Sequence, residues 1–340
     1  LRSVQRPEPQ THNPMKQTFH IFTLLALLLL TGGISNPESP PNFVFILVDD
    51  LGWADVKCNY PKSFYETPNI ETLASEGIAF PYGYVNGGNC APTRAAILSG
   101  QFGARPTNNV FNVHNLNRGN TSSNSTLIGP DMGLASNGQD QIPSTAITIA
   151  ETLKTAGYTT AHWGKYHSGE DEATNFSNNA PTDQGFDYNY GGGQAGGPGN
   201  YFASANSPYT FGSNIDPNMD VYADPYTLTE SIALSVNGDN ALEGTPKHVT
   251  DAPADAAIDF MEAEKYTPFF MHFSNFAIHG PTGQSHARPD LYAKYVAKNN
   301  TNPSSMGHNN LGIAAILEGM DQTLGRLVDY LKTNGVDFPI

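Results

Sequence analysis

Short apolar segments alternate with segments of helical periodicity along the chain, and this alternation limits the possible folds more than any other feature. Residues 42–48 form a continuous apolar run that stops at two aspartates, which predicts a strand buried on both faces. Helices are then expected over about 67–77, 92–98, 144–155, 253–264 and 311–332, and strands over 158–163 and 268–275. The alternation predicts an α/β fold in which a central, mostly parallel sheet carries helices on both faces.

The composition argues against some functions. Hydrophobic residues make up 39% of the 340 residues, with 16 Tyr and 18 Phe, which is typical of a globular protein rather than a disordered one. The 32 acidic side chains against 17 basic ones give a formal net charge of −15. A general electrostatic attraction to nucleic acid or to an anionic membrane is therefore not expected. Any site for an anion has to be built locally from a few placed cations and a metal.

The N-terminal part has the pattern of an export signal. Lys16 precedes the apolar run 21–30, and small residues follow. Residues 15–35 are therefore predicted to be a secretory signal, and residues 1–14 a leader or an artefact upstream of it. The apolar run is short for a transmembrane span and no second one follows, so no stable membrane association is expected. The protein is predicted to be secreted or periplasmic.

Two adjacent carboxylates, Asp49 and Asp50, stand where the first predicted strand ends. Ligand sites in open α/β sheets collect at the carboxyl ends of the strands. Two neighbouring carboxylates repel each other unless a cation lies between them, and hard divalent ions such as Ca²⁺ prefer oxygen ligands of this type. The pair therefore indicates a metal site, with an ordinary Asp-rich turn as the alternative.

A second signal is the segment CAPTRAAILSGQ over residues 90–101. Pro92 suits the first turn of a helix, which would place Cys90 at the positive end of that helix. Arg94 lies one turn later and can reach back to the same place. Because an exported protein meets oxidising conditions, a disulfide between Cys58 and Cys90, or a plain buried cysteine, is the alternative.

Two further segments carry histidines after predicted strands. Lys165 and His167 stand two residues apart, so an extended segment would present a cation and a titratable base on one face. A solvated lysine and a surface histidine are the alternative. His162 does not fit this spacing and is expected to be structural. His279 follows the strand over 268–275 in a His-Gly-Pro turn.

Together these motifs resemble the formylglycine-dependent (type I) sulfatases of the alkaline-phosphatase-like superfamily, from about residue 41 to residue 340. The resemblance rests on Cys-x-Pro-x-Arg with its Leu-Ser-Gly tail, on Gly-Lys-x-His at 164–167 and on the His-x-Pro turn at 279–281. Relatives often carry Pro before that histidine, where this chain has Ile278. Residues 319–327 resemble the helix that precedes the family's Asp-Asn metal strand, for which no counterpart follows.

The resemblance implies an alkaline-phosphatase-like fold and a role for each of these residues. A formylglycine-generating maturation enzyme would oxidise Cys90 to formylglycine, whose hydrate attacks the sulfur of a sulfate ester. Arg94 and Lys165 would hold the hydrate and the sulfate oxygens. His279 would protonate the leaving alkoxide, and His167 would act as the base when sulfate is expelled.

The resemblance also implies a metal and a domain organisation. Asp49, Asp50 and the oxygen of residue 90 would bind Ca²⁺, with Mg²⁺ less expected. Residues 36–340 would be the N-terminal catalytic part of such an enzyme, truncated at its C-terminal end, with a Gly-rich insertion over 183–245. With the family's later metal strand absent, the fragment is expected to bind Ca²⁺ weakly and to show little activity.

The identity of the substrate stays open at this point. Export and an aromatic, Gly-rich insertion favour a sulfated polysaccharide, and a small aryl or alkyl sulfate is the alternative. A phosphonate or phosphodiester hydrolase of the same fold could use the same modified cysteine. From a different class, a non-catalytic extracellular binding module could retain the fold without ever being matured.

Overall fold

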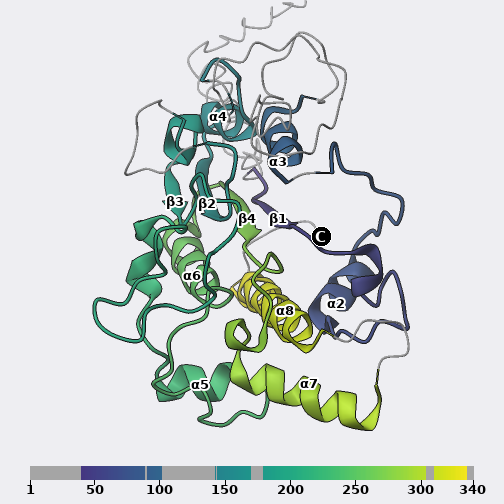
Figure 1. Cartoon of the computed structure of the whole chain (residues 1–340). Helices are drawn as coiled ribbons and strands as arrows, with labels where there is room; N and C mark the ends of the chain where they lie inside the picture. The colour runs from purple at the N-terminus through teal and green to yellow at the C-terminus, as the bar shows by residue number, and fades with distance from the viewer. Residues whose placement is uncertain are drawn as a thin grey trace, which may run out of the picture. The chain divides into compact units, whose positions relative to one another are not determined.

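The structure is a computed structural model that describes residues 40–88, 90–101, 142, 144–169, 179–303 and 310–334. All elements below belong to the unit formed by residues 41–340 (Figure 1). The predicted leader over 1–14 and the predicted signal over 15–35 lie outside the described residues.

Four parallel strands form the sheet of the described part, in the order β1-β4-β2-β3. They are β1 (Phe43–Val48), β2 (Thr159–Gly164), β3 (Tyr188–Tyr190) and β4 (Phe269–Asn275). The register pairs Val48 of β1 with Asn275 of β4, and Gly164 of β2 with Ser274 of β4. The carboxyl ends of these three strands therefore meet at one edge of the sheet.

The strand that is buried on both faces is β4, not β1. Every residue of β4 is buried. Phe269 and Met271 belong to one hydrophobic cluster, while Phe270 between them belongs to another on the opposite face. In β1, by contrast, Phe43 and Phe45 are 44% and 40% exposed. The prediction of a doubly buried first strand is wrong: Val44, Ile46 and Val48 pack on the large hydrophobic cluster, whereas Phe43 and Phe45 point to the other face, which the described residues leave partly open.

Helices cover both faces of the sheet, as predicted (Figure 1). The cluster around Phe270 includes side chains of α3 and α4, and the cluster around Met271 includes those of α6, α7 and α8. The helices are α2 (Pro68–Glu76), α3 (Cys90–Ser99), α4 (Ile149–Thr155), α5 (Leu228–Leu234), α6 (Ala252–Glu264), α7 (Pro289–Thr301) and α8 (Leu311–Thr333). Short 3-10 turns occur at η1 (Trp53–Asp55), η3 (Pro181–Gln184), η4 (Pro217–Tyr222) and η5 (Gln284–His286).

Two predicted helix starts are shifted, and local capping explains one of them. The helix expected from about residue 144 begins at Ile149, because the Thr148 side chain accepts a hydrogen bond from the backbone N–H of Glu151 and forms a capping box with it. The helix expected from residue 92 begins two residues earlier, at Cys90.

Residues 183–245, predicted as a Gly-rich insertion, contain β3, η4 and α5. Much of the segment is buried: Tyr201, Phe211, Ile215 and Met219 are all part of the large hydrophobic cluster that covers one face of the sheet. These residues therefore form part of the core that supports the sheet.

The N-terminus of α2 is capped from a distance. Thr67 precedes the helix, as the sequence indicates, but its side chain makes no capping hydrogen bond. The buried carboxylate of Asp321 in α8 instead accepts hydrogen bonds from the backbone N–H groups of Asn69, at 3.0 Å, and Ile70, at 2.8 Å. Because the first N–H groups of a helix have no partner within it, this carboxylate stabilises α2 and joins it to α8.

Replacing Asp321→Ala should therefore lower the free energy of unfolding by about 1–3 kcal/mol, since two helix N–H groups lose a charged acceptor. Thr67→Val, which keeps the shape of the buried side chain and removes only a 3.4 Å hydrogen bond to Glu71, should cost less than Asp321→Ala. Urea unfolding of both variants measures the difference. Equal losses would mean that Thr67 is the true cap.

Candidate active site

The predicted site residues gather where the strands end. Asp49 follows β1, Lys165 follows β2, and His279 lies in the turn after β4. Cys90 begins α3, so its side chain stands at the N-terminal, positive end of a ten-residue helix. The structure therefore brings to one edge of the sheet four residues that lie far apart in the sequence.

Two buried cations share the carboxylate of Asp49. Nε of Arg94 lies 2.9 Å and Nζ of Lys165 lies 2.7 Å from the same atom, Oδ2. The side chains of Arg94 and Lys165 are only 1% and 0% exposed. Burial by itself would raise the pKa of Asp49, but the two cations outweigh it and hold the pKa of this carboxyl below its usual value.

Arg94 makes further hydrogen bonds besides its ion pair with Asp49, and one of its nitrogens has no partner in the described part of the chain. Its Nη1 donates to the backbone oxygen of Lys165 and to Oγ of Ser274, at 2.6 Å from the latter. Its Nη2 is buried and finds no hydrogen-bond partner among the described residues. Sequence reasoning missed Ser274, because nothing in its local pattern distinguishes it from the rest of a buried strand.

Lys165 reaches Asp49 through a tight turn at the end of β2. Gly164 has a φ of +75°, and a Cβ there would lie 2.1 Å from the backbone oxygen of Ser274. Only glycine tolerates both conditions. Lys165 and His167 both lie beyond the end of β2, and His167 has a φ of +53°. The premise that these two residues lie in an extended segment is therefore wrong: a turn, not strand alternation, directs Lys165 to Asp49 and His167 to Cys90.

His167 lies beside Cys90. Its Nδ1 is 3.2 Å from Sγ of Cys90. Both cysteines of the chain are free thiols, and Cys58 is exposed. The structure thus contradicts the disulfide alternative and places a titratable nitrogen within hydrogen-bond distance of the residue predicted to become the nucleophile.

His279 is held through its backbone by the 183–245 segment. The buried hydroxyl of Tyr201 donates to the backbone oxygen of His279 at 2.6 Å. The His279 ring lies with Nδ1 2.8 Å from the backbone oxygen of Gly280, so Nδ1 carries the hydrogen. This leaves Nε2 as the ring nitrogen that can take up or release a proton. Ile278, which stands where relatives often have proline, is buried in the core.

His162 is structural, as predicted. Its ring is fully buried, with Nδ1 2.8 Å from Nδ1 of His272 and Nε2 donating to the backbone oxygen of Gly164 at 3.1 Å. Burial lowers the pKa of His162 to about 3, so the ring stays neutral at ordinary pH. Its hydrogen bond to Gly164 also supports the turn that aims Lys165.

The described residues offer only part of a calcium site. Asp49 is engaged by Arg94 and Lys165, while Asp50 is exposed and has a φ of +58°. No group of three His, Cys, Asp or Glu side chains that could hold a metal is present among the described residues. Two carboxylates fall short of the six to eight oxygen ligands that Ca²⁺ takes.

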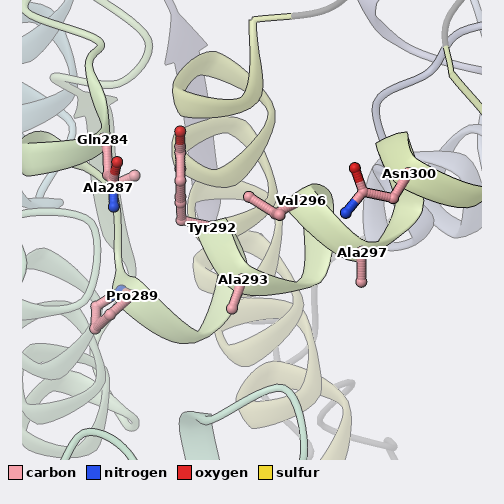
Figure 2. A pocket seen from close by; sticks show the side chains of 8 residues that line it. All are labelled: Gln284, Ala287, Pro289, Tyr292, Ala293, Val296, Ala297 and Asn300. Atoms are coloured by element: carbon pink, nitrogen blue, oxygen red, sulfur yellow. The ribbon is translucent and has the colours of Figure 1, made fainter.

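A groove of about 490 Å³ lies elsewhere, along α7 and η5 (Figure 2). It is lined by Gln284, Ala287, Pro289, Tyr292, Ala293, Val296, Ala297 and Asn300. None of the predicted site residues lines it. The groove therefore gives no support to the predicted chemistry, which rests on the edge of the sheet.

The comparisons with known proteins agree with this fold. Residues 41–340 match the sulfatase family model, so the chain belongs to the sulfatase family. It is 34% identical to a sulfatase of Formosa agariphila, with 92% of this chain and 57% of that protein covered. It is 28% identical to the N-acetylgalactosamine-6-sulfatase of Rattus norvegicus, with 92% and 50% covered.

Solved structures show the same architecture. The structure of Ps i-CgsB in complex with k-i-k-neocarrahexaose matches with a TM-score of 0.54 at 25% identity, covering 87% of this chain and 56% of that one. The predicted alkaline-phosphatase-like fold is confirmed. The chain spans about half the length of the curated relatives it matches.

Asp49→Asn should lower the free energy of unfolding by about 3–5 kcal/mol, because Arg94 and Lys165 would remain buried without their counterion. The adjacent Asp50→Asn is the matched control. It changes an exposed side chain, and asparagine tolerates the left-handed backbone there, so its effect should stay within about 0.5 kcal/mol. Urea unfolding in the presence of a chelator measures both variants. A loss for Asp49→Asn no larger than that for Asp50→Asn would show that the ion pairs contribute little.

Proposed function

We propose that the protein is a sulfuric ester hydrolase in which Cys90, oxidised to formylglycine, provides the nucleophile. The observation that carries this proposal is the convergence of Cys90, His167 and two buried cations at the carboxyl edge of the sheet. A hydrated aldehyde at residue 90 would supply one hydroxyl to attack the ester sulfur and a second to expel the bound sulfate. A formylglycine-generating enzyme is the partner that this chemistry requires.

Arg94 and Lys165 are proposed to bind the sulfate group. Their positive charges lie in a buried environment, where an interaction with an anion is stronger than in water. Arg94 also has a buried Nη2 with no partner among the described residues, and a sulfate oxygen would satisfy it. Both groups would stabilise the charge that spreads over the sulfate oxygens in the transition state.

The two histidines are proposed to move the protons. His279 would protonate the leaving alkoxide from Nε2, because its Nδ1 hydrogen is bound to the oxygen of Gly280. His167 would act as the base that removes the proton from residue 90, from which its Nδ1 is 3.2 Å away. His279 would donate a proton and His167 would accept one, so the two roles are assigned to two separate rings.

Asp49, Asp50 and the oxygen of residue 90 are proposed as ligands of Ca²⁺, which prefers oxygen ligands of this kind. The described residues supply only part of such a site. Calcium titration that gives equal affinity for the parent protein and for Asp50→Asn would contradict this assignment.

The substrate is proposed to be a sulfated carbohydrate outside the cell. N-acetylgalactosamine-6-sulfatases are among the relatives, and a similar structure is in complex with k-i-k-neocarrahexaose. Secreted or periplasmic location fits such a polymer, and the N-terminal segment supports it. The described residues contain no helix with the length and apolar character of a membrane span. A small aryl or alkyl sulfate is the second candidate.

Two other functions remain as rivals. A phosphonate or phosphodiester hydrolase of the same fold would use the same cations and histidines. A non-catalytic binding module would keep the fold with Cys90 unmodified. The intact Cys-x-Pro-x-Arg segment and the two buried cations favour catalysis over simple binding.

When the protein is coexpressed with a maturation enzyme, the tryptic peptide that contains residue 90 should carry an aldehyde in place of the thiol. Cys90→Ser should fold but lack sulfatase turnover, because a sulfated serine has no second hydroxyl to expel the sulfate. Peptide mass spectrometry and a sulfate-release assay test the two statements. Normal turnover by Cys90→Ser would refute the mechanism.

Lys165→Ala, His167→Ala and His279→Ala should each lower turnover about 100-fold or more, because each removes a charge stabiliser or a proton-transfer group. Lys154→Ala, a half-exposed lysine paired with Asp187, is the matched control and should change turnover less than about twofold. His162→Ala should lower stability more than it lowers turnover. In an otherwise complete enzyme, losses below threefold for the first three variants would make them structural or surface residues.

A further inference from the structure

The glycine-rich part of the 183–245 segment lies directly against the rings of His167 and His279, the two histidines proposed to be catalytic. A Cβ on Gly196 would lie 2.5 Å from Cε1 of His167, and a Cβ on Gly197 would lie 2.4 Å from Nδ1 of His279. Real Cβ atoms do not approach other heavy atoms below 3.0 Å. Two consecutive residues thus touch two different rings, and neither has room for a side chain while the rings stay where they are.

The segment is anchored at several points around these contacts. The backbone N–H of His167 donates to the oxygen of Gly193 at 2.9 Å. The side-chain amide of Asn214 donates to the oxygen of Gly197 at 3.1 Å. The hydroxyl of Tyr201 donates to the oxygen of His279. Because the backbone is held on both sides of the two glycines, it forms a fixed wall against which the rings rest.

The backbone at the two glycines does not itself demand glycine. Neither Gly196 nor Gly197 has a φ in the left-handed region, whereas nine other glycines of the described chain do. An alanine at either position is therefore allowed by the backbone, and the three atoms nearest to the new methyl group all belong to an imidazole ring. Since a ring can rotate about its side-chain bonds, an added methyl group should displace the ring rather than unfold the chain.

We propose that Gly196 and Gly197 are positioning residues, which hold His167 and His279 in the orientations that their proton transfers need. The inference rests on the roles proposed above for the two histidines. It also gives the Gly-rich segment a function in the chemistry: its backbone forms one wall of the site, and its lack of side chains lets the two rings lie against adjacent residues.

The test compares Gly196→Ala and Gly197→Ala with the control Gly283→Ala in the matured protein. A Cβ on Gly283 meets nothing within 4 Å, and its φ is −74°. Turnover is measured with two sulfate esters, one with a nitrophenol leaving group and one with a sugar alcohol. Unfolding midpoints are measured on the same samples.

We expect Gly197→Ala to lower kcat about tenfold or more for the sugar sulfate and much less for the nitrophenyl sulfate, because only a poor leaving group needs the proton from His279. Gly196→Ala should lower kcat for both esters alike, because His167 acts on residue 90 and not on the leaving group. Gly283→Ala should match the parent. Parent-like kinetics in both variants would overturn the proposal.

A double variant guards against a structural explanation. In a His279→Ala background, Gly197→Ala should cause no further loss of turnover and should leave the unfolding midpoint unchanged, because the new methyl group has no ring to meet. If Gly197→Ala alone lowers the midpoint, the double variant must recover it. If the unfolding midpoint of the double variant stays low, the new methyl group conflicts with something other than the His279 ring, which would contradict the inference.

The proposed function and this inference fail in different ways. A matured protein that is produced from a longer version of the chain, of the length of its relatives, and that releases no sulfate from either ester would refute the function. The imidazole signals of His167 and His279 in nuclear magnetic resonance spectra would still test the positioning. We expect Gly196→Ala to shift the His167 ring signals and Gly197→Ala those of His279, and unshifted signals in both would refute the inference.

Discussion

The two ion pairs of Asp49 are the interaction on which the candidate site depends. Through Arg94 and Lys165 they join the end of β1 to α3 and to the turn after β2, and Arg94 extends the connection to Ser274 in β4. Two buried cations therefore stand within ion-pair distance of a single carboxylate. A chain with a formal net charge of −15 can in this way place two cations where an anion is expected to bind.

The parallel sheet explains why these groups meet. The register aligns the last residues of β1, β4 and β2, so the segments that follow the strands begin side by side. Gly164 then turns the chain so closely over Ser274 that no side chain fits between them. His162 bonds to the oxygen of that same glycine from within the core. The site is thus positioned by backbone register and a tight turn, which are more rigid than a loop.

The sequence predicted the α/β fold and the residues that meet at the edge, because strand ends and short motifs are local features. What it could not predict depends on contacts between distant segments. One face of β1 is partly exposed. The carboxylate that caps α2 comes from Asp321 in α8. Ser274 accepts a hydrogen bond from Arg94, which lies 180 residues away in the sequence. The contacts of Gly196 and Gly197 with the histidines belong to the same class, since glycine runs alone indicate only a loop.

Selectivity between sulfur and phosphorus is the property that follows most directly from the proposed chemistry. The matured protein should be assayed with a sulfate monoester, a phosphate diester and a phosphonate monoester that share one leaving group, under identical conditions. The proposed mechanism predicts that kcat/KM is highest for the sulfate ester and falls when Cys90 is left unmodified. A higher kcat/KM for either phosphorus ester would contradict the assignment of the protein as a sulfuric ester hydrolase.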